Sequence, residues 1–139
     1  MPADRPSAIR PTSHPRHILV VDDEPNIVTL VRDVFERRGH RVSASSSAVE
    51  ALGWIRKGER FDIVVTDQTM PEITGIELAR TIAERMPGAK VLLCSGRDDM
   101  IDQDEIAAAN VAGFAPKPFN LIELVETVDS LLRDAAAVG

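Results

Sequence analysis

Five side chains that could carry out phosphoryl or metal chemistry stand at the ends of short apolar runs of this sequence. They are the carboxylates of Asp22, Asp23 and Asp67, the hydroxyl of Ser95 and the ammonium of Lys117. The apolar runs that precede them cover residues 18–21, 63–66, 91–94 and 112–115. Buried parallel strands read as such runs, and the ligand crevice of an open α/β sheet lies at their carboxyl ends. We therefore expect the five side chains to converge at one edge of a sheet.

Carboxylates that lie close together repel one another unless a positive charge stands among them. A hard divalent cation prefers oxygen ligands, so it is the expected partner of Asp22, Asp23 and Asp67. Lys117 would add a second positive charge at the same place. These residue types together indicate a metal-assisted phosphoryl site.

Asp67 is the strongest candidate for a nucleophile. An aspartate at the end of a strand often serves as a helix cap or a turn former. Here Thr74 stands where the next helix begins and can serve as its cap, which leaves the Asp67 carboxylate free to react. A carboxylate nucleophile that attacks phosphorus forms an acyl phosphate.

The elements that must position these side chains alternate between strand and helix from His17 onward. Strands are predicted at 18–21, 42–44, 63–66, 91–94 and 112–115, and helices begin at Pro25, Ser47, Thr74, about Met100 and Asn120. Ser47 and Thr74 each precede a glutamate by three residues, the pattern of a capping box. The helix over 100–110 has a thin apolar face and is the weakest of the five. Five βα units predict an α/β fold with a parallel five-stranded sheet.

The composition suits one domain of 139 residues, and 44% hydrophobic residues are enough for a real core. The formal net charge of −6 argues against nucleic-acid binding, which requires clustered basic residues. No apolar stretch approaches the roughly 20 residues that span a bilayer, so we expect a cytoplasmic protein without membrane contact. Residues 1–16 are rich in proline and predict a disordered leader or linker, residues 17–134 the domain, and residues 135–139 a C-terminal tail.

Taken in order, these residues resemble the receiver domain of two-component response regulators. The matching pieces are Asp22-Asp23, Asp67 with the stretch to Gly75, Ser95-Gly96 and Lys117-Pro118-Phe119. The resemblance covers about residues 17–134 and is specific because all pieces occur in order, each at a predicted strand end. It implies a flavodoxin-like, doubly wound (βα)5 fold with strand order 2-1-3-4-5.

The resemblance also implies a role for each site residue. Asp67 is the phosphoacceptor, and Mg²⁺ is held by Asp23 directly, by Asp22 through water, by Asp67 and by the main-chain carbonyl of Thr69. Lys117 pairs with the Asp67 carboxylate and then with a phosphoryl oxygen. Ser95 and Phe114 are the switch residues, and Gln68 and Arg97 flank the site.

Two of these positions depart from the common family pattern. Many receivers have threonine where Ser95 stands and tyrosine where Phe114 stands, so the switch is expected to work by the same route with a different amplitude. Phe114 also has a simpler interpretation as a core phenylalanine.

The implied function is signalling rather than turnover of a small molecule. A sensor histidine kinase or a histidine phosphotransfer protein would donate a phosphoryl group to Asp67, and the domain would change conformation. A downstream protein would then bind the face formed by the fourth helix, fifth strand and fifth helix of a monomer or weak dimer. The chain would not be an enzyme beyond catalysing its own phosphorylation and dephosphorylation.

Several alternatives remain open. Too few residues follow Leu132 for an output domain, so a free-standing regulator is expected, but a receiver domain from a hybrid sensor kinase or larger regulator is the alternative. A metal-dependent phosphatase of related topology would need a second aspartate where Thr69 stands. A flavin-binding protein would need a loop that cradles phosphate after the first strand, where Asp22-Asp23-Glu24 would repel it.

Overall fold

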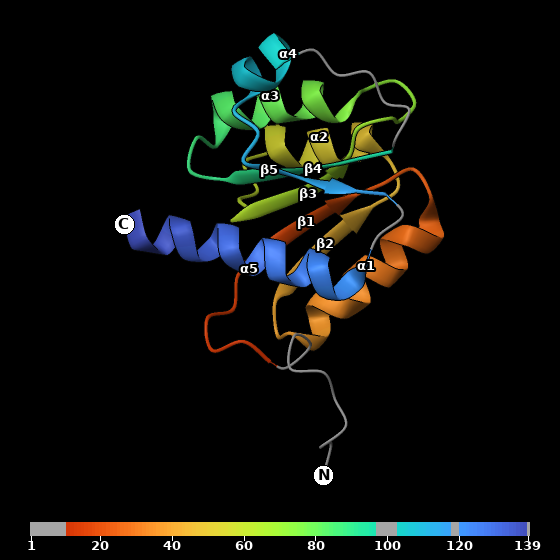
Figure 1. The fold of residues 1–139 in the computed structure, drawn as a ribbon. Coiled ribbons are helices and arrows are strands. Elements are labelled where there is room, and N and C mark those ends of the chain that lie inside the picture. Colours follow the sequence, from red (N-terminus) through yellow and green to blue (C-terminus); the bar gives the residue numbers. More distant parts are fainter. Residues whose placement is uncertain (1–10, 97–102, 118–119, 139) are drawn as a thin grey trace.

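The computed structural model describes residues 11–96, 103–117 and 120–138, and the order of their elements is a strict alternation of strand and helix (Figure 1). The strands are β1 (His17–Val21), β2 (Arg41–Ser45), β3 (Ile63–Asp67), β4 (Lys90–Ser95) and β5 (Gly113–Pro116). The helices are α1 (Pro25–Arg37), α2 (Ala48–Arg56), α3 (Gly75–Arg85), α4 (Gln103–Ala109) and α5 (Leu121–Val138). The five predicted βα units are all present.

The strands form one parallel sheet in the order β2-β1-β3-β4-β5, which confirms the predicted doubly wound fold. The direction of winding reverses between β1 and β3, and ligand sites of such sheets lie outside the strand ends at this reversal. The register aligns the carboxyl ends of the strands. The pairs at these ends are Val21 with Thr66, Asp67 with Cys94, and Ser95 with Pro116.

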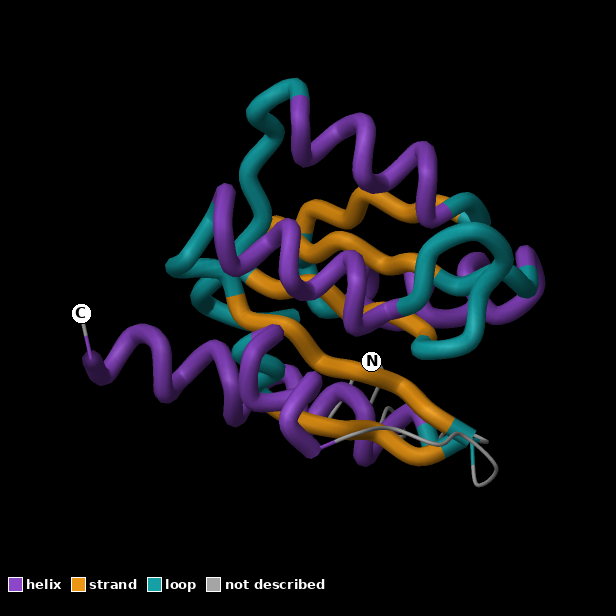
Figure 2. Tube along the Cα trace, turned by 90° about the horizontal axis from the view of Figure 1, so that it is seen from above, coloured by secondary structure: helices purple, strands orange, loops and turns teal. Residues whose placement is uncertain are grey.

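Helices cover both faces of the sheet: α1 and α5 lie on one face, and α2, α3 and α4 lie on the other (Figures 1 and 2). Successive strand residues point to opposite faces, so the sheet has two cores. Leu19 and Val21 belong to the core under α2 and α3, whereas Ile18 and Val20 pack with α1 and α5. This explains why the strands are continuous apolar runs. Among the described helices, none is both long and apolar enough to cross a membrane.

The two predicted capping boxes differ in the structure. At α3 the box is complete, because the Thr74 hydroxyl accepts from the Glu77 N–H and the Glu77 carboxylate accepts from the Thr74 N–H. At α2 only half of it forms. Ser47 caps the Glu50 N–H at 3.1 Å, but the Glu50 carboxylate accepts a hydrogen bond from the Ser45 hydroxyl instead of returning to Ser47.

The observed bounds of the last two helices differ from the predicted ones. The described part of α4 runs over Gln103–Ala109, and Ala109 alone of its residues is buried, in line with the predicted thin apolar face. Residues 100–102 of the predicted helix lie outside the described residues. Helix α5 continues past residue 134 to Val138, because the alanines that follow have the highest helix propensity.

The described part of the proline-rich leader is held against the domain. The Thr12 N–H donates to the Arg38 carbonyl at 2.6 Å, and the Arg16 N–H donates to Nδ1 of His40 at 2.9 Å. These two bonds connect residues 12–16 to the turn between α1 and β2. Residues 1–10 of the leader lie outside the described residues.

A candidate acidic site at the carboxyl edge of the sheet

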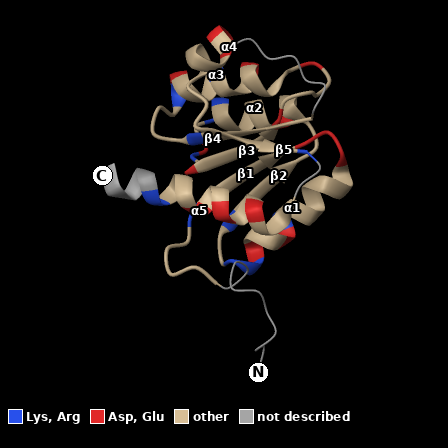
Figure 3. Ribbon diagram, viewed as in Figure 1, with Lys and Arg blue, Asp and Glu red and all other residues tan. Residues whose placement is uncertain are grey.

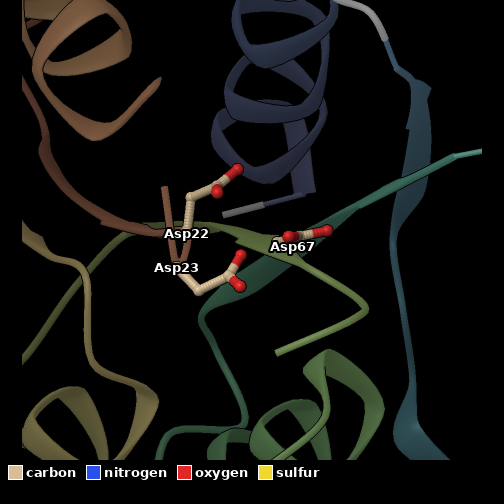
Figure 4. A group of neighbouring side chains, drawn as sticks. All are labelled: Asp22, Asp23 and Asp67. Atoms are coloured by element: carbon tan, nitrogen blue, oxygen red, sulfur yellow. The ribbon is translucent and has the colours of Figure 1, made fainter. Parts of the chain in front are cut away.

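The sheet brings the predicted site residues to one edge. Asp67 and Ser95 are the last residues of β3 and β4, Asp22 and Asp23 follow β1, and Lys117 follows β5. Oxygens of the three aspartates lie within 4.8 Å of one another (Figure 4). The prediction that these residues come together at one edge of the sheet is confirmed, because the carboxyl ends of parallel strands in this register lie side by side.

Lys117 joins two of the carboxylates. Its Nζ lies 2.8 Å from Oδ2 of Asp22 and 3.1 Å from Oδ2 of Asp67. Its main-chain N–H donates to the Ser95 carbonyl at 3.0 Å, which fixes the residue beside the end of β4. Burial disfavours the ammonium, but the hydrogen bonds to both carboxylates outweigh it and raise the pKa of Lys117. The ammonium is therefore a fixed positive charge at neutral pH.

Asp22 and Asp23 differ in exposure and in the use of their oxygens. Asp22 is buried, its Oδ1 accepts from the Glu24 N–H at 2.9 Å, and its Oδ2 accepts from Lys117. Both of its oxygens are therefore engaged. Asp23 is exposed, so its carboxylate is the one of the pair that faces solvent.

Asp67 is 6% exposed, and burial raises the pKa of its carboxyl. The hydrogen bond from Lys117 and its positive charge lower this pKa, and so does the Thr69 N–H, whereas the negative charge of Asp22 raises it. The net effect is a raised pKa for Asp67. Among the described residues of this cluster, three carboxylates against one ammonium leave an excess of two negative charges, which matches the charge of one divalent cation. The oxygen donors and the excess charge both fit a hard cation such as Mg²⁺.

The loop between β3 and α3 is fixed by contacts that the sequence did not reveal. The Gln68 N–H donates to the Cys94 carbonyl at 2.9 Å, and its own carbonyl accepts from Gly75 at 3.0 Å. Its side-chain Oε1 accepts from the Ile76 N–H at 3.0 Å. Gly75 packs so closely that a Cβ there would overlap the main-chain carbonyl of Asp67. Gln68, which the resemblance places at the flank of the site, therefore anchors the first turn of α3 beside Asp67.

The remaining predicted residues are placed as follows. Ser95 is half-buried, and Ser95, Phe114 and Lys117 line one surface hollow. Phe114 is 46% exposed, so the alternative interpretation as a core residue is wrong. The side chain of Thr69 is exposed, and Arg97 lies outside the described residues.

Comparison with known proteins identifies a family for this chain. The sequence matches the family described as the response regulator receiver domain over residues 18–129. The DNA-binding transcriptional regulator NtrC of Azospirillum brasilense is 31% identical over 116 residues, which is 84% of this chain and 24% of NtrC. The chain spans about a quarter to about half of the length of such curated regulators.

Solved structures agree with this match. The CheY-like receiver domain protein of Methanospirillum hungatei JF-1 has a TM-score of 0.84 and 25% identity, covering 91% of this chain and 100% of that one. The response regulator TrrA of Thermotoga maritima, solved in complex with Mg²⁺ and BeF, has a TM-score of 0.73 and 33% identity. That comparison covers 84% of this chain and 98% of TrrA.

Proposed function

The chain belongs to the family of response regulator receiver domains, and on that premise we propose that Asp67 accepts a phosphoryl group and thereby switches the domain. One observation carries this proposal most directly. The Lys117 ammonium lies between the buried carboxylates of Asp22 and Asp67, while the nearby Asp23 carboxylate faces solvent. Such a site would offer an anionic nucleophile and a fixed cation at the same strand ends.

A magnesium ion is the cofactor that fits this site. Asp23 and Asp67 would hold it directly, Asp22 would act through water because both its oxygens are engaged, and the Thr69 carbonyl would complete the protein ligands. When bound, Mg²⁺ neutralises negative charge on a phosphoryl group during transfer. A metal-dependent phosphatase is a poorer fit, since it would need an aspartate at Thr69.

The chain's own residues account for the transfer step. A carboxylate oxygen of Asp67 forms a bond to phosphorus while the bond from phosphorus to a histidine nitrogen of the donor breaks, which leaves an acyl phosphate. Lys117 keeps its partner Asp22 and exchanges the Asp67 oxygen for a phosphoryl oxygen. Lys117 and the main-chain N–H groups near Asp67 then stabilise the added negative charge of the phosphoryl group.

The signal would leave the site through Ser95 and Phe114. The Ser95 hydroxyl would donate to the new phosphoryl group, and Phe114 would turn toward the space beside β5. Both residues border one hollow, and Phe114 is 46% exposed. The surface formed by α4, β5 and α5 would change with them and bind a downstream protein.

The phosphoryl donor would be a sensor histidine kinase or a histidine phosphotransfer protein in the cytoplasm. On this proposal the domain has no small-molecule substrate and catalyses only its own phosphorylation and dephosphorylation. It would act as a monomer or weak dimer and would not bind nucleic acid itself. The full reading frame distinguishes a free-standing regulator from a domain of a hybrid kinase or larger regulator.

A small phosphodonor tests the proposal without the cognate kinase. Wild-type protein incubated with acetyl phosphate should gain the mass of one phosphoryl group in the presence of Mg²⁺ and not in EDTA. Asp23→Asn should weaken Mg²⁺ binding in calorimetry and slow the gain, while stability in EDTA holds or rises because repulsion is relieved. Mass gain that is independent of Mg²⁺, or unchanged Mg²⁺ affinity in the variant, would contradict it.

A further inference from the structure

A second pocket lies at the opposite end of the sheet, where β1 begins. It has a volume of about 480 Å³, within the range of small-molecule sites. Its walls come from the leader, the turn between α1 and β2, and the C-terminal half of α5. The polar residues that matter for its chemistry are Thr12, Arg16, Arg38, His40, Asp129 and Arg133.

The pocket is basic although the chain carries a net charge of −6. Its one carboxylate, Asp129, is already bound by Nη2 of Arg38 at 2.6 Å and so does not neutralise the other guanidinium groups. Nη1 of Arg16 lies 4.0 Å from Oδ1 of Asp62, which is a weak ion pair. Arg133 has no ion pair within the described part of the chain. Figure 3 shows basic residues at the lower end of α1 and toward the C-terminal part of α5.

Helix ends do not account for these cations. Basic residues often stand in the last turn of a helix, where they complement its dipole. At the end of α1, however, the Arg38 carbonyl accepts from the Thr12 N–H, and the Phe35 and Glu36 carbonyls also have backbone donors. Helix α5 runs on to Val138, so Arg133 lies more than one turn before its end, beyond the reach of the dipole.

His40, which lines the pocket, carries a buried hydrogen-bond donor without a partner among the described residues. The residue is only 5% exposed, and its Nδ1 accepts from the Arg16 N–H, so the proton of the neutral imidazole must be on Nε2. Burial and the nearby Arg38 guanidinium lower the pKa of His40, which keeps the ring neutral. Its Nε2 has no acceptor among the described residues. Buried donors without acceptors are rare in folded proteins.

We propose that this pocket binds a small organic phosphate, held by the guanidinium groups of Arg16 and Arg133. Guanidinium groups match phosphate oxygens in geometry as well as charge. The cavity is larger than a bare phosphate needs, and Leu132 and the stems of the arginines supply an apolar surface for the organic part. The site is separate from Asp67 and independent of the proposed phosphorylation.

Isothermal titration calorimetry with ATP in EDTA, which keeps divalent cations out of the acidic site, provides the test. Wild-type protein should bind ATP saturably. The double variant Arg16→Gln/Arg133→Gln should bind at least about tenfold more weakly, or about 1.4 kcal/mol. The matched control Arg32→Gln/Arg56→Gln removes the same charge from exposed positions on α1 and α2 and should bind like wild type.

Amide chemical shifts should locate the bound ATP. The expected changes fall within residues 12–16, 38–41 and 129–133, and Asp67→Asn should leave binding unchanged, which separates this proposal from phosphorylation. Absence of saturable binding, equal losses in both double variants, or shift changes confined to residues around Asp67 would each overturn the proposal.

Discussion

Lys117 holds two buried carboxylates together, and its removal would leave both without their cation. Breaking a fully buried ion pair in this way costs about 3–5 kcal/mol. The Lys117 side chain is 20% exposed, so solvent compensates for part of the loss. We expect Lys117→Met to lower the free energy of unfolding in EDTA by about 2 kcal/mol.

Urea denaturation measures this loss, with Lys57→Met at the exposed end of α2 as the matched control. Added Mg²⁺ should restore part of the stability of Lys117→Met, because a cation again lies among the carboxylates. If both lysine variants unfold at the same urea concentration, the ion pairs of Lys117 do not contribute to stability as argued.

Asp67 should make stability depend on pH in the opposite direction from an ordinary salt-bridged aspartate. Burial raises the pKa of its carboxyl in the native state despite Lys117, so the folded protein disfavours the ionised form. This destabilisation is fully present above the folded-state pKa and is lost as the pH falls below the unfolded value near 3.8. In EDTA, Asp67→Asn should therefore be more stable than wild type at pH 7.

Urea unfolding from pH 7 down to pH 4 should show this difference between wild type and Asp67→Asn shrinking. A difference that stays constant over this range, or greater stability of the wild type at pH 7, would show that Lys117 outweighs burial at this carboxyl.

At the scale of elements, the loop between β3 and α3 has no room for a larger residue at Gly75. A methyl group there would meet the main-chain carbonyl of Asp67, which cannot move aside as a flexible side chain would. Overpacking of this kind costs typically 1–3 kcal/mol, and a main-chain neighbour places Gly75→Ala near the upper end, at about 2–3 kcal/mol. Because the shift falls on Asp67, phosphorylation by acetyl phosphate should also slow.

Gly53 within α2 is the matched control for Gly75, because a Cβ built there meets no described atom within 4 Å apart from its chain neighbours and the backbone of its own helix. Gly53→Ala should stabilise the protein by about 0.5–1 kcal/mol, since alanine is the better helix former. Thermal or urea unfolding of both variants provides the measurement. A Gly75→Ala variant as stable as wild type would mean that the loop is not packed against Asp67 as described.

The sequence predicted the elements where one local signal decides them. The apolar runs and Pro25 located four strand ends and the start of α1, and these set the positions of Asp22, Asp67 and Lys117. The predicted hydrogen bond from the Glu50 carboxylate back to Ser47 was wrong. Glu50 instead accepts from Ser45, and this contact depends on how β2 and α2 pack together. The role of Gln68 was missed for the same reason, since it depends on contacts with α3 and β4 that no spacing along the chain reveals.

At the scale of the whole molecule, the acidic site and the basic pocket lie at opposite ends of the same sheet. The strand order could be predicted only through the family resemblance, because several parallel orders fit five βα units. The docked leader and the pocket beside it were not predictable. Both depend on hydrogen bonds from the N–H groups of Thr12 and Arg16 to the turn after α1, and this turn is distant from the leader in sequence.

The switch is a property of the whole domain and should appear in amide exchange. A beryllofluoride phosphate mimic with Mg²⁺ should change protection mainly within residues 95–119, which include Ser95 and Phe114. Trp54, half-buried on α2, should change little in fluorescence. Asp67→Asn with the same additions is the control and should show no change. Changes centred instead on residues 25–57 would contradict the proposed switch while leaving the phosphoacceptor untested.

The identity of the phosphoacceptor is the central claim, and intact mass of Asp67→Asn tests it most directly. With acetyl phosphate and Mg²⁺, wild type should gain one phosphoryl group that hydroxylamine removes, whereas Asp67→Asn should gain none and keep its fold. Asp62→Asn, just before the same strand, is the matched control and should be labelled like wild type. Labelling of Asp67→Asn at the wild-type rate would contradict the account.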